Sequence, residues 1–431
     1  MRIAVLVLAL GVVYTRAPLA AQSVVDVALA ESPPVDKPPL LLAAHLAQEK
    51  DGFRVVPYGA FWSDMIYASQ RTNPGSFTLY VLSEEDQGEP AFTLDARRSR
   101  FGLDLFGPTI PTAEPLKTGG RVEIDFQGRF VVENSAAVLL RHAYWEAYND
   151  SQRILIGQNW DVISPLIPRT LNYAAGYSSG NLGFRRAQFR YDRYFTCSER
   201  TKLILQTSLN QDIVADFATD SSVRRESADW PVIEGRAALS FDPGADGRLT
   251  TLGVSGHIGE TGFDFLEAGP PPLSLPPQDD ARFETWSYNL DFATPLGERA
   301  HLQAEFFHGK NLSPQLGGIG QGICPCVREP IESIGGWVDV QYVWTPKLRT
   351  HVGYGIDDPN DDDMLLGRVS NQVLFVNLTC DVTPQLLTGL ETSYWKTHYQ
   401  ETRGGLVPDD QLGPTAPGEA VVVEFMVKYS F

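Results

Sequence analysis

Apolar and polar side chains alternate with a period of two from residue 51 to the C-terminus. In the final segment, 421–431, every second position is apolar and builds one face from Val421, Val423, Phe425, Val427, Tyr429 and Phe431. The segments 121–127, 286–292 and 338–344 repeat the alternation. Amphipathic helices instead show apolar recurrence at three and four residues, which these segments lack. The pattern therefore predicts strands with one apolar side and one polar side.

Turn residues divide this region into about sixteen strands, an even number such as single-chain bacterial barrels have. The predicted strands are 54–67, 91–107, 118–131, 136–149, 151–160, 182–195, 201–215, 231–242, 248–258, 283–294, 299–308, 334–345, 347–357, 367–380, 383–397 and 419–431. Their connections alternate between short and long, as periplasmic turns and external loops do. Two connections break this alternation, the long link 108–117 and the short loop 132–135.

Three features favour a membrane barrel over a soluble β protein. The terminal strand is longer than the five or six residues usual in soluble sheets. The chain ends on the aromatic Phe431, which resembles the signal that the bacterial outer-membrane assembly machinery reads. The third feature is an export signal at the N-terminus, described next. We therefore expect an all-β fold, a transmembrane antiparallel up-and-down β-barrel whose apolar face meets outer-membrane lipid and whose polar face lines a lumen.

The N-terminus is typical of an exported protein. Arg2 precedes an apolar core at 3–13, and small residues lead to a cleavage position before Gln22. We expect residues 1–21 to be a signal peptide, which is removed after export. Prolines interrupt residues 22–50, which we interpret as a periplasmic N-terminal segment in which 40–50 can form a short amphipathic helix. Residues 51–431 are then the barrel domain.

Composition excludes several classes of function. The formal charge is −18, from 35 Lys+Arg and 53 Asp+Glu. A nucleic-acid-binding protein needs a dense basic face, so nucleic acid is not an expected partner. Beyond the N-terminus no apolar run approaches the roughly 20 residues of a membrane helix. No nucleophile elbow, P-loop, zinc-protease or dinucleotide motif is present, so we expect neither an enzyme nor a cofactor.

Several sequence blocks resemble the DcaP-like family of outer-membrane porins. They are 99–108, 119–126, 140–144, 156–160 and 180–191, and the likeness extends over 91–195 and the terminal strand. The resemblance implies a sixteen-stranded, homotrimeric barrel that takes up small organic anions such as dicarboxylates. It departs at the N-terminus, because 22–50 is too short and too rich in proline for the family's helical coiled-coil segment.

Strand parity directs a set of arginines into the lumen. Their predicted positions are Arg98 and Arg100 on the second strand, Arg121 and Arg129 on the third, Arg186 and Arg190 on the sixth, and Arg236 on the eighth. Guanidinium groups lining a narrow aqueous lumen favour anions. The alternative is that each arginine pairs with a luminal carboxylate, such as Glu123, Asp125, Asp104 or Asp192, and only braces the wall.

The fourth strand is ambiguous, because adjacent positions at 141 and 142 are both polar. A lipid-facing arginine at mid-membrane costs about 2–4 kcal/mol. We therefore place Arg141 inward and expect a bulge after it. His142 has no metal or acid–base partner at a suitable spacing, so we interpret it as structural.

Residues 161–181 follow the fifth strand and correspond to the third external loop of porins, which folds into the barrel and narrows it. In that position Asp161, Arg169, Asn172 and Tyr173 can touch the solute. The alternative is a loop that caps the surface, but the apolar pairs at 162–163 and 166–167 need something to pack against.

Other candidate sites stay open on sequence alone. Cys324 and Cys326 can close a small disulfide or bind a metal weakly, whereas Cys197 and Cys380 lie on opposite sides of a closed barrel and cannot pair. The acidic run 357–363 can hold calcium, although a solvated loop is the commoner outcome. We expect no bound metal.

The sequence thus predicts a porin for small hydrophilic solutes, with organic anions favoured at an arginine-lined constriction. Two alternatives remain. A plugged outer-membrane barrel acting as an enzyme or adhesin would conduct no ions, and a secreted soluble β protein would need no detergent.

Overall fold

A computed structural model describes residues 48–50, 52–129, 135–212, 223–226, 228–269, 273–400 and 414–431. In these residues nineteen strands form one antiparallel sheet. Three of them, β1 (Gln48–Lys50), β5 (Ala91–Asp95) and β12 (Val223–Glu226), are short additions to longer neighbours, which leaves sixteen around the circumference. The predicted signal peptide and most of the segment 22–50 lie outside the described residues.

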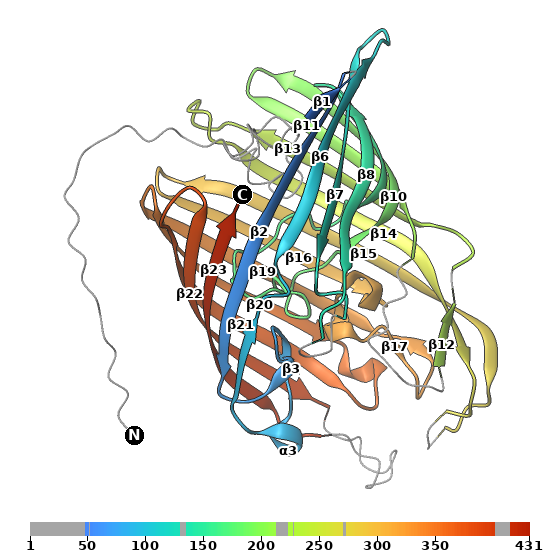
Figure 1. Cartoon of the computed structure of the whole chain (residues 1–431). Coiled ribbons are helices and arrows are strands. Elements are labelled where there is room, and N and C mark those ends of the chain that lie inside the picture. Colours follow the sequence, from blue (N-terminus) through green and yellow to red (C-terminus); the bar gives the residue numbers. More distant parts are fainter. Residues whose placement is uncertain are drawn as a thin grey trace, which may run out of the picture.

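The sixteen strands run in sequence order, each paired with its neighbours, and the sheet closes into a barrel (Figure 1). They are β2 (Phe53–Ala68), β6 (Arg100–Ile110), β7 (Leu116–Asp125), β8 (Leu139–Tyr148), β9 (Gln152–Trp160), β10 (Arg185–Ser198), β11 (Thr201–Asn210), β13 (Val232–Phe241), β14 (Thr250–Phe265), β15 (Gln278–Leu296), β16 (Ala300–Lys310), β19 (Glu332–Thr345), β20 (Leu348–Pro359), β21 (Arg368–Asp381), β22 (Leu386–Tyr399) and β23 (Gly418–Ser430). The predicted fold class is confirmed.

The two connections that seemed to break the alternation of short and long have different lengths in the structure than predicted. The strand β6 continues to Ile110 and β7 begins at Leu116, so the link between them is a short turn. The strand β7 ends at Asp125 and β8 begins at Leu139, so their connection is a long external one. A different correction applies near the N-terminus, where residues 48–50 extend along β2 as β1 rather than forming part of a helix.

Alternation separates the two faces of the wall as the sequence pattern requires. Apolar side chains such as Leu290 on β15 and its cross-strand neighbours Val254 and Phe306 are exposed on the outside. Between them, polar side chains such as Asn289 and Asp291 are buried inside the barrel. A closed antiparallel barrel satisfies its backbone hydrogen bonds between strands, so its apolar outer band can face lipid.

The barrel closes where the first strand meets the last. The strand β2 pairs with β23 from Ala60–Ser430 to Ala68–Val422. The last residue continues this pairing, because the backbone N–H and C=O of Phe431 both hydrogen-bond Gly59, at 3.0 and 3.1 Å. A Cβ at Gly59 would lie 2.6 Å from the Phe431 ring, so glycine makes room for the terminal aromatic side chain.

Three long connections fold into the external half of the lumen, opposite the end where the C-terminus lies (Figure 1). The first joins β2 to β5 and holds β3 (Thr72–Pro74), β4 (Thr78–Val81) and the helix α3 (Glu84–Gln87). The second, residues 161–184, is the third external loop. The next, 311–331, contains η1 (Ser313–Gln315), η2 (Gly318–Gly320), β17 (Ile323–Cys324) and β18 (Glu329–Pro330). No helix in the described part of the chain is long and apolar enough to cross a membrane.

These three connections share one apolar cluster. Phe77 and Leu79 of the first pack with Ala174 and Tyr177 of the third loop and with Leu316 of the connection 311–331. All five side chains are buried. The interior of the barrel is therefore partly filled by its own loops, and the open space that remains is bounded by them.

Candidate pore constriction

Four acids on the barrel wall hold the backbone of the third external loop. Their carboxylates accept hydrogen bonds from successive amides of the loop, and each acid lies on a different strand. The pairs are Val162 N to Glu234 on β13 at 2.7 Å, Leu166 N to Glu305 on β16 at 2.7 Å, Arg169 N to Asp339 on β19 at 2.9 Å, and Leu171 N to Glu391 on β22 at 2.7 Å. After β9 the loop thus enters the lumen, as the sequence predicted, and it follows the inner wall past β13, β16, β19 and β22.

Apolar side chains fix the loop as well. Ile163 and Leu182 pack with Phe307 and Leu312, and Leu166 packs with Trp337. The return of the loop at Gly180 lies so close to the backbone of β19 that no side chain fits there, and its φ of +110° also favours glycine. The apolar pairs in the sequence were therefore the correct signal for an inward loop.

The third external loop borders a cavity of about 610 Å³ inside the barrel. Its lining contains seven arginines and one lysine: Arg98, Arg100, Arg121, Arg141, Arg169, Arg185, Arg349 and Lys428. Against these stand two carboxylates, Glu123 and Asp339, together with three histidines. Five of the predicted residues, Arg98, Arg100, Arg121, Arg141 and Arg169, therefore line the same space.

Ion pairs neutralise part of this basic lining. The Arg121 Nε lies 2.7 Å from Asp104, and Arg141 contacts both Glu123 at 2.6 Å and Asp125 at 2.9 Å. These pairs match the alternative in which luminal arginines brace the wall. Arg121 and Arg141 each bind carboxylates that are themselves inside the barrel, so these ion pairs add little net positive charge to the cavity.

Two other arginines of the lining form no ion pair with any described residue. Arg169 lies on the third external loop, and only its backbone N–H and C=O make hydrogen bonds to the wall. Arg185 lies at the start of β10, where its guanidinium stacks on the rings of Trp160 and Phe184. Their positive charges are therefore available to the lumen.

Arg98 lies in the turn between β5 and β6 and not within a strand as predicted. Its guanidinium carbon lies 4.0 Å from the Trp62 ring centroid, and Nη1 donates to the carbonyl oxygen of Leu171 at 2.5 Å. The same group lies 3.7 Å from Asp64. This arginine joins the wall, the third loop and the cavity.

The remaining predicted residues lie elsewhere. Arg186 is fully buried and binds Asp161 at 2.7 Å, so this pair fastens the base of the loop behind the cavity. Arg190 pairs with Asp192 at 2.8 Å, and Arg236 pairs with Asp291 at 2.6 Å. Arg190 and Arg236 both line a second recess, which is smaller than the cavity described above.

Arg129 does not face the lumen. The predicted third strand ran to residue 131, but β7 ends at Asp125, whose carboxylate accepts the Gln127 N–H at 3.0 Å and draws the chain out of the ladder. Arg129 is exposed in the external connection, where its Nη1 lies 3.4 Å from the Ser135 hydroxyl.

The ambiguity of the fourth strand is solved by a bulge. The pairing of β8 with β7 shifts between Glu123–His142 and Ile124–Leu140, so Arg141 is the extra residue. Both Arg141 and His142 are buried inside, and Trp145 faces outward. The predicted bulge thus allows two successive polar side chains to avoid the lipid.

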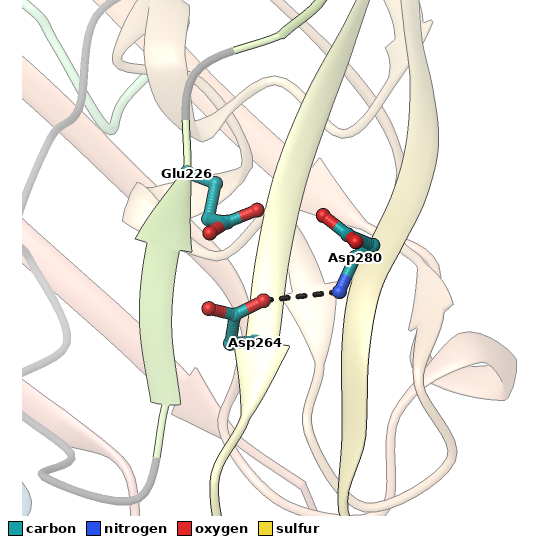
Figure 2. Close-up of side chains that lie close together, drawn as sticks. All are labelled: Glu226, Asp264 and Asp280. Carbon is teal, nitrogen blue, oxygen red and sulfur yellow. Dashed lines mark hydrogen bonds between the residues drawn. The ribbon is translucent and has the colours of Figure 1, made fainter.

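Among the described residues, one group of three carboxylates converges as a metal site would (Figure 2). Glu226, Asp264 and Asp280 come from β12, β14 and β15, and the Asp280 N–H donates to Asp264 at 3.0 Å. Arg224 contacts both Glu226 and Asp264, and Arg282 lies 3.5 Å from Glu226 and Asp280. The two guanidiniums already supply the positive charge that the acids need.

The acidic run 357–363 serves local structure. Asp357 accepts hydrogen bonds from the Ile319 N–H and the Ser333 hydroxyl, and Asp363 accepts one from the Glu332 N–H.

The four cysteines are free. The hydrogen bond from Cys326 lowers the pKa of the Cys324 thiol to about 6, in a loop cluster that also contains Met364.

No family model and no curated protein matches this sequence. The fold is nevertheless similar to solved outer-membrane channels. The outer membrane channel DcaP of Acinetobacter baumannii matches with a TM-score of 0.67 and 17% identity, over 89% of this chain and 99% of that one. The anion-selective porin from Comamonas acidovorans matches with a TM-score of 0.53 and 11% identity, over 88% and 100%.

The Salmonella typhi OmpF complex with daunomycin gives a TM-score of 0.51 and 12% identity, over 89% of this chain and 100% of that one. At such identities the likeness concerns the fold alone. It agrees with the architecture that the DcaP-like resemblance implied. The chain is a closed sixteen-stranded barrel with the fold of the outer-membrane porins, DcaP among them.

Proposed function

We propose that this protein is an outer-membrane channel through which small hydrophilic solutes diffuse, with organic anions favoured. The outer band of apolar side chains suits lipid, and an inward loop leaves a polar cavity inside the barrel. The outer membrane channel DcaP and the anion-selective porin from Comamonas acidovorans share its fold. Its location is then the bacterial outer membrane, reached by export with removal of residues 1–21.

The observation that supports anion preference is the excess of basic over acidic side chains in the lining of the cavity. Eight basic side chains line it against two carboxylates, although the whole chain has a formal charge of −18. Both carboxylates are engaged, Glu123 by Arg141 and Asp339 by His351. Clustered cations in a lumen with low-dielectric walls concentrate positive potential and draw in anions.

Dicarboxylates fit this arrangement better than monocarboxylates. Arg185 and Arg349 lie on strands β10 and β20, which are seven places apart in the ring of sixteen and therefore on nearly opposite walls, and Arg349 is also paired with Asp381 at 2.8 Å. Arg169 approaches the same space from the loop. A solute with two carboxylates can meet two guanidiniums at once, and each pairing is a charge-assisted hydrogen bond.

We also propose a homotrimer, with the outer band facing lipid where it does not face another copy. An OmpT porin-fold neighbour from Vibrio cholerae is described in a trimer form, which supports this state by analogy. Phe431 packs against Phe61, with ring centroids 5.4 Å apart, at the seam of the barrel. Its terminal position suits recognition by the outer-membrane assembly machinery before the seam closes.

Purified protein in a planar lipid bilayer tests the channel and its charge preference together. Under a KCl gradient we expect conductance and a reversal potential that gives chloride a higher permeability than potassium. Liposomes should swell faster with succinate than with a cationic solute of similar size. The result follows from the basic cavity and should weaken at high salt, because salt screens the field.

A preference for potassium would contradict the anion proposal while leaving a channel. Folded protein without conductance would contradict the channel and favour the plugged barrel. A variant outside the cavity, Arg248→Gln, is the matched control for charge: it removes one arginine from an ion pair with Asp246 in a surface turn and should leave the reversal potential unchanged.

A further inference from the structure

Two cysteines come together in a tight turn of the connection 311–331. Cys324 ends β17, and Cys326 lies two residues later in the turn that leads to β18. The Arg328 N–H closes this turn by donating to the carbonyl oxygen of Cys324 at 2.7 Å, and the φ of Arg328 is +53°. The curled backbone places both side chains in one packed cluster, where the Cys326 thiol donates a hydrogen bond to the sulfur of Cys324.

The sulfur of Cys324 has the surroundings of a thiolate. In addition to the Cys326 thiol, the backbone N–H groups of Leu365, Val327 and Cys326 donate hydrogen bonds to it. Donors around a sulfur stabilise its charged form. The bond from Cys326 lowers the pKa of Cys324 to about 6 against the effect of burial, and the amides act in the same direction. The same bond raises the pKa of Cys326, so at neutral pH the pair holds one proton, which lies on Cys326.

The two cysteines differ in their access to solutes. Cys324 is 3% exposed and packs with Ile331 and Met364. Cys326 packs against the same cluster but is partly exposed. A dissolved reagent therefore meets Cys326 first, and Cys324 reacts only with a group that Cys326 has already brought into the turn.

A metal site fits these residues less well than a redox pair. Structural zinc takes four protein ligands. Among the described residues, the group of three His, Cys, Asp or Glu ligands that converges is the carboxylate trio of β12, β14 and β15, which contains neither thiol. Two thiols in contact, one of them already a thiolate, are instead the components of thiol–disulfide exchange.

We propose that Cys324 and Cys326 are a thiol–disulfide exchange site, in which a small disulfide such as glutathione disulfide oxidises the pair to an internal disulfide. Cys326 is the thiol that reacts with the incoming disulfide, and Cys324 is the thiol that resolves the mixed disulfide. This inference goes beyond the proposed function and does not depend on it, because it concerns the chemistry of one connection and not the passage of solutes.

The reduction of the incoming disulfide balances the reaction. Cys326 passes its proton to the Cys324 sulfur and attacks one sulfur of the oxidant, which forms a mixed disulfide and releases one thiolate. That thiolate takes the proton from Cys324. The Cys324 thiolate then attacks the Cys326 sulfur and releases the second thiolate, so the pair loses two electrons and the oxidant gains them.

Mass spectrometry of the purified protein tests the site. The protein is incubated with glutathione disulfide, quenched with acid, labelled with N-ethylmaleimide and digested. We expect the peptide that contains both cysteines to be unlabelled and lighter by two hydrogen atoms, and dithiothreitol to restore two labels. Cys197 is the internal control, because this exposed cysteine has no second thiol in its turn and should gain a glutathionyl group or a label.

Two serine variants assign the roles of the two thiols. Cys324→Ser keeps the accessible thiol without its resolving partner, so a glutathionyl group should accumulate on Cys326. Cys326→Ser keeps only the buried thiol, and its glutathionyl content should be at least about ten-fold lower. Resistance of the folded band to SDS shows that each variant is assembled.

The contrary outcomes are distinct. Two labels on the wild-type peptide after the incubation, or a stable mixed disulfide in place of the internal one, would overturn the exchange site. Equal glutathionylation of the two variants would overturn the assigned roles. Labels that appear only after a chelator is added would replace the disulfide by a metal site. Each result is read from the cysteines alone, so a channel that prefers potassium would overturn the proposed function and leave this site unaffected.

Discussion

Replacing Glu305 and Glu391 together by alanine is expected to increase the single-channel conductance and to make the current fluctuate. Glu305 accepts the Leu166 N–H at 2.7 Å, and Glu391 accepts the Leu171 N–H at 2.7 Å and the Thr170 hydroxyl at 2.6 Å. Without these acceptors the middle of the third external loop loses its attachment to β16 and β22. The loop then moves within the lumen, and the passage it narrows becomes wider on average.

The expected effect is large because three hydrogen bonds that hold the loop are lost together. Each contributes about 0.5–1.5 kcal/mol, so losing three of them should be enough to detach a short stretch of loop. Conductance and current noise in a planar bilayer measure the change. Glu305→Gln and Glu391→Gln keep an acceptor oxygen and should give intermediate values.

Glu419→Ala is the matched control. Glu419 lies at the start of β23 and pairs on the outside with Lys396 at 2.8 Å, so its loss leaves the loop attached. A double variant with the conductance of the wild type, when Glu419→Ala is also unchanged, would show that the apolar contacts of Ile163 and Leu166 hold the loop without the acids.

Replacing Arg141 by alanine should destabilise the barrel more than any other single loss of a luminal charge described above. The side chains of Arg141, Glu123 and Asp125 are 3%, 9% and 0% exposed. Removing the guanidinium leaves two carboxylates close together and buried without their main partner. Breaking a buried ion pair in this way costs about 3–5 kcal/mol.

The temperature at which the folded band converts to the unfolded one on an SDS gel measures this loss. Arg141→Lys should recover part of the stability, because lysine restores one charge but cannot reach both acids with a planar fork. Arg248→Ala instead breaks the pair with Asp246 in a surface turn and should change the temperature little. Equal shifts for Arg141→Ala and Arg248→Ala would contradict the buried network.

The sequence predicted the strands and their facing because alternation is a local property. A side chain on a barrel strand points either to the lumen or to the outside, and apolar side chains such as Leu290 point to the outside. The cost of a lipid-facing arginine also placed Arg141 correctly and required the bulge that β8 contains. The third loop was predicted from apolar residues that needed packing partners.

Strand ends were harder to predict, since they depend on competition between the ladder and local hydrogen bonds. Asp125 captures the Gln127 amide and ends β7, which removes Arg129 from the lumen. Arg185 was missed because strict parity with Arg186 placed it outside. The argument used for Arg141, that arginine avoids lipid, would have found it.

The inward folding of the other two connections was also missed. Phe77, Leu79 and Leu316 are apolar residues in segments that read as external loops, and they carry the same signal as residues 162–167. Arg349 lines the cavity from β20, which the sequence likeness did not cover closely, and Lys428 lines it from the terminal strand, which the likeness did cover. Which inward positions converge depends on the ring of strands, and no short stretch of sequence contains that information.

The shared cluster of Phe77, Tyr177 and Leu316 has a consequence for maturation. Its members come from connections that are far apart in the chain, so we expect them to meet only after the strands between them, β6 to β16, have assembled. The wall is then expected to form before the loops pack inside it. A barrel whose loops have not yet packed is a wider channel that discriminates less between solutes.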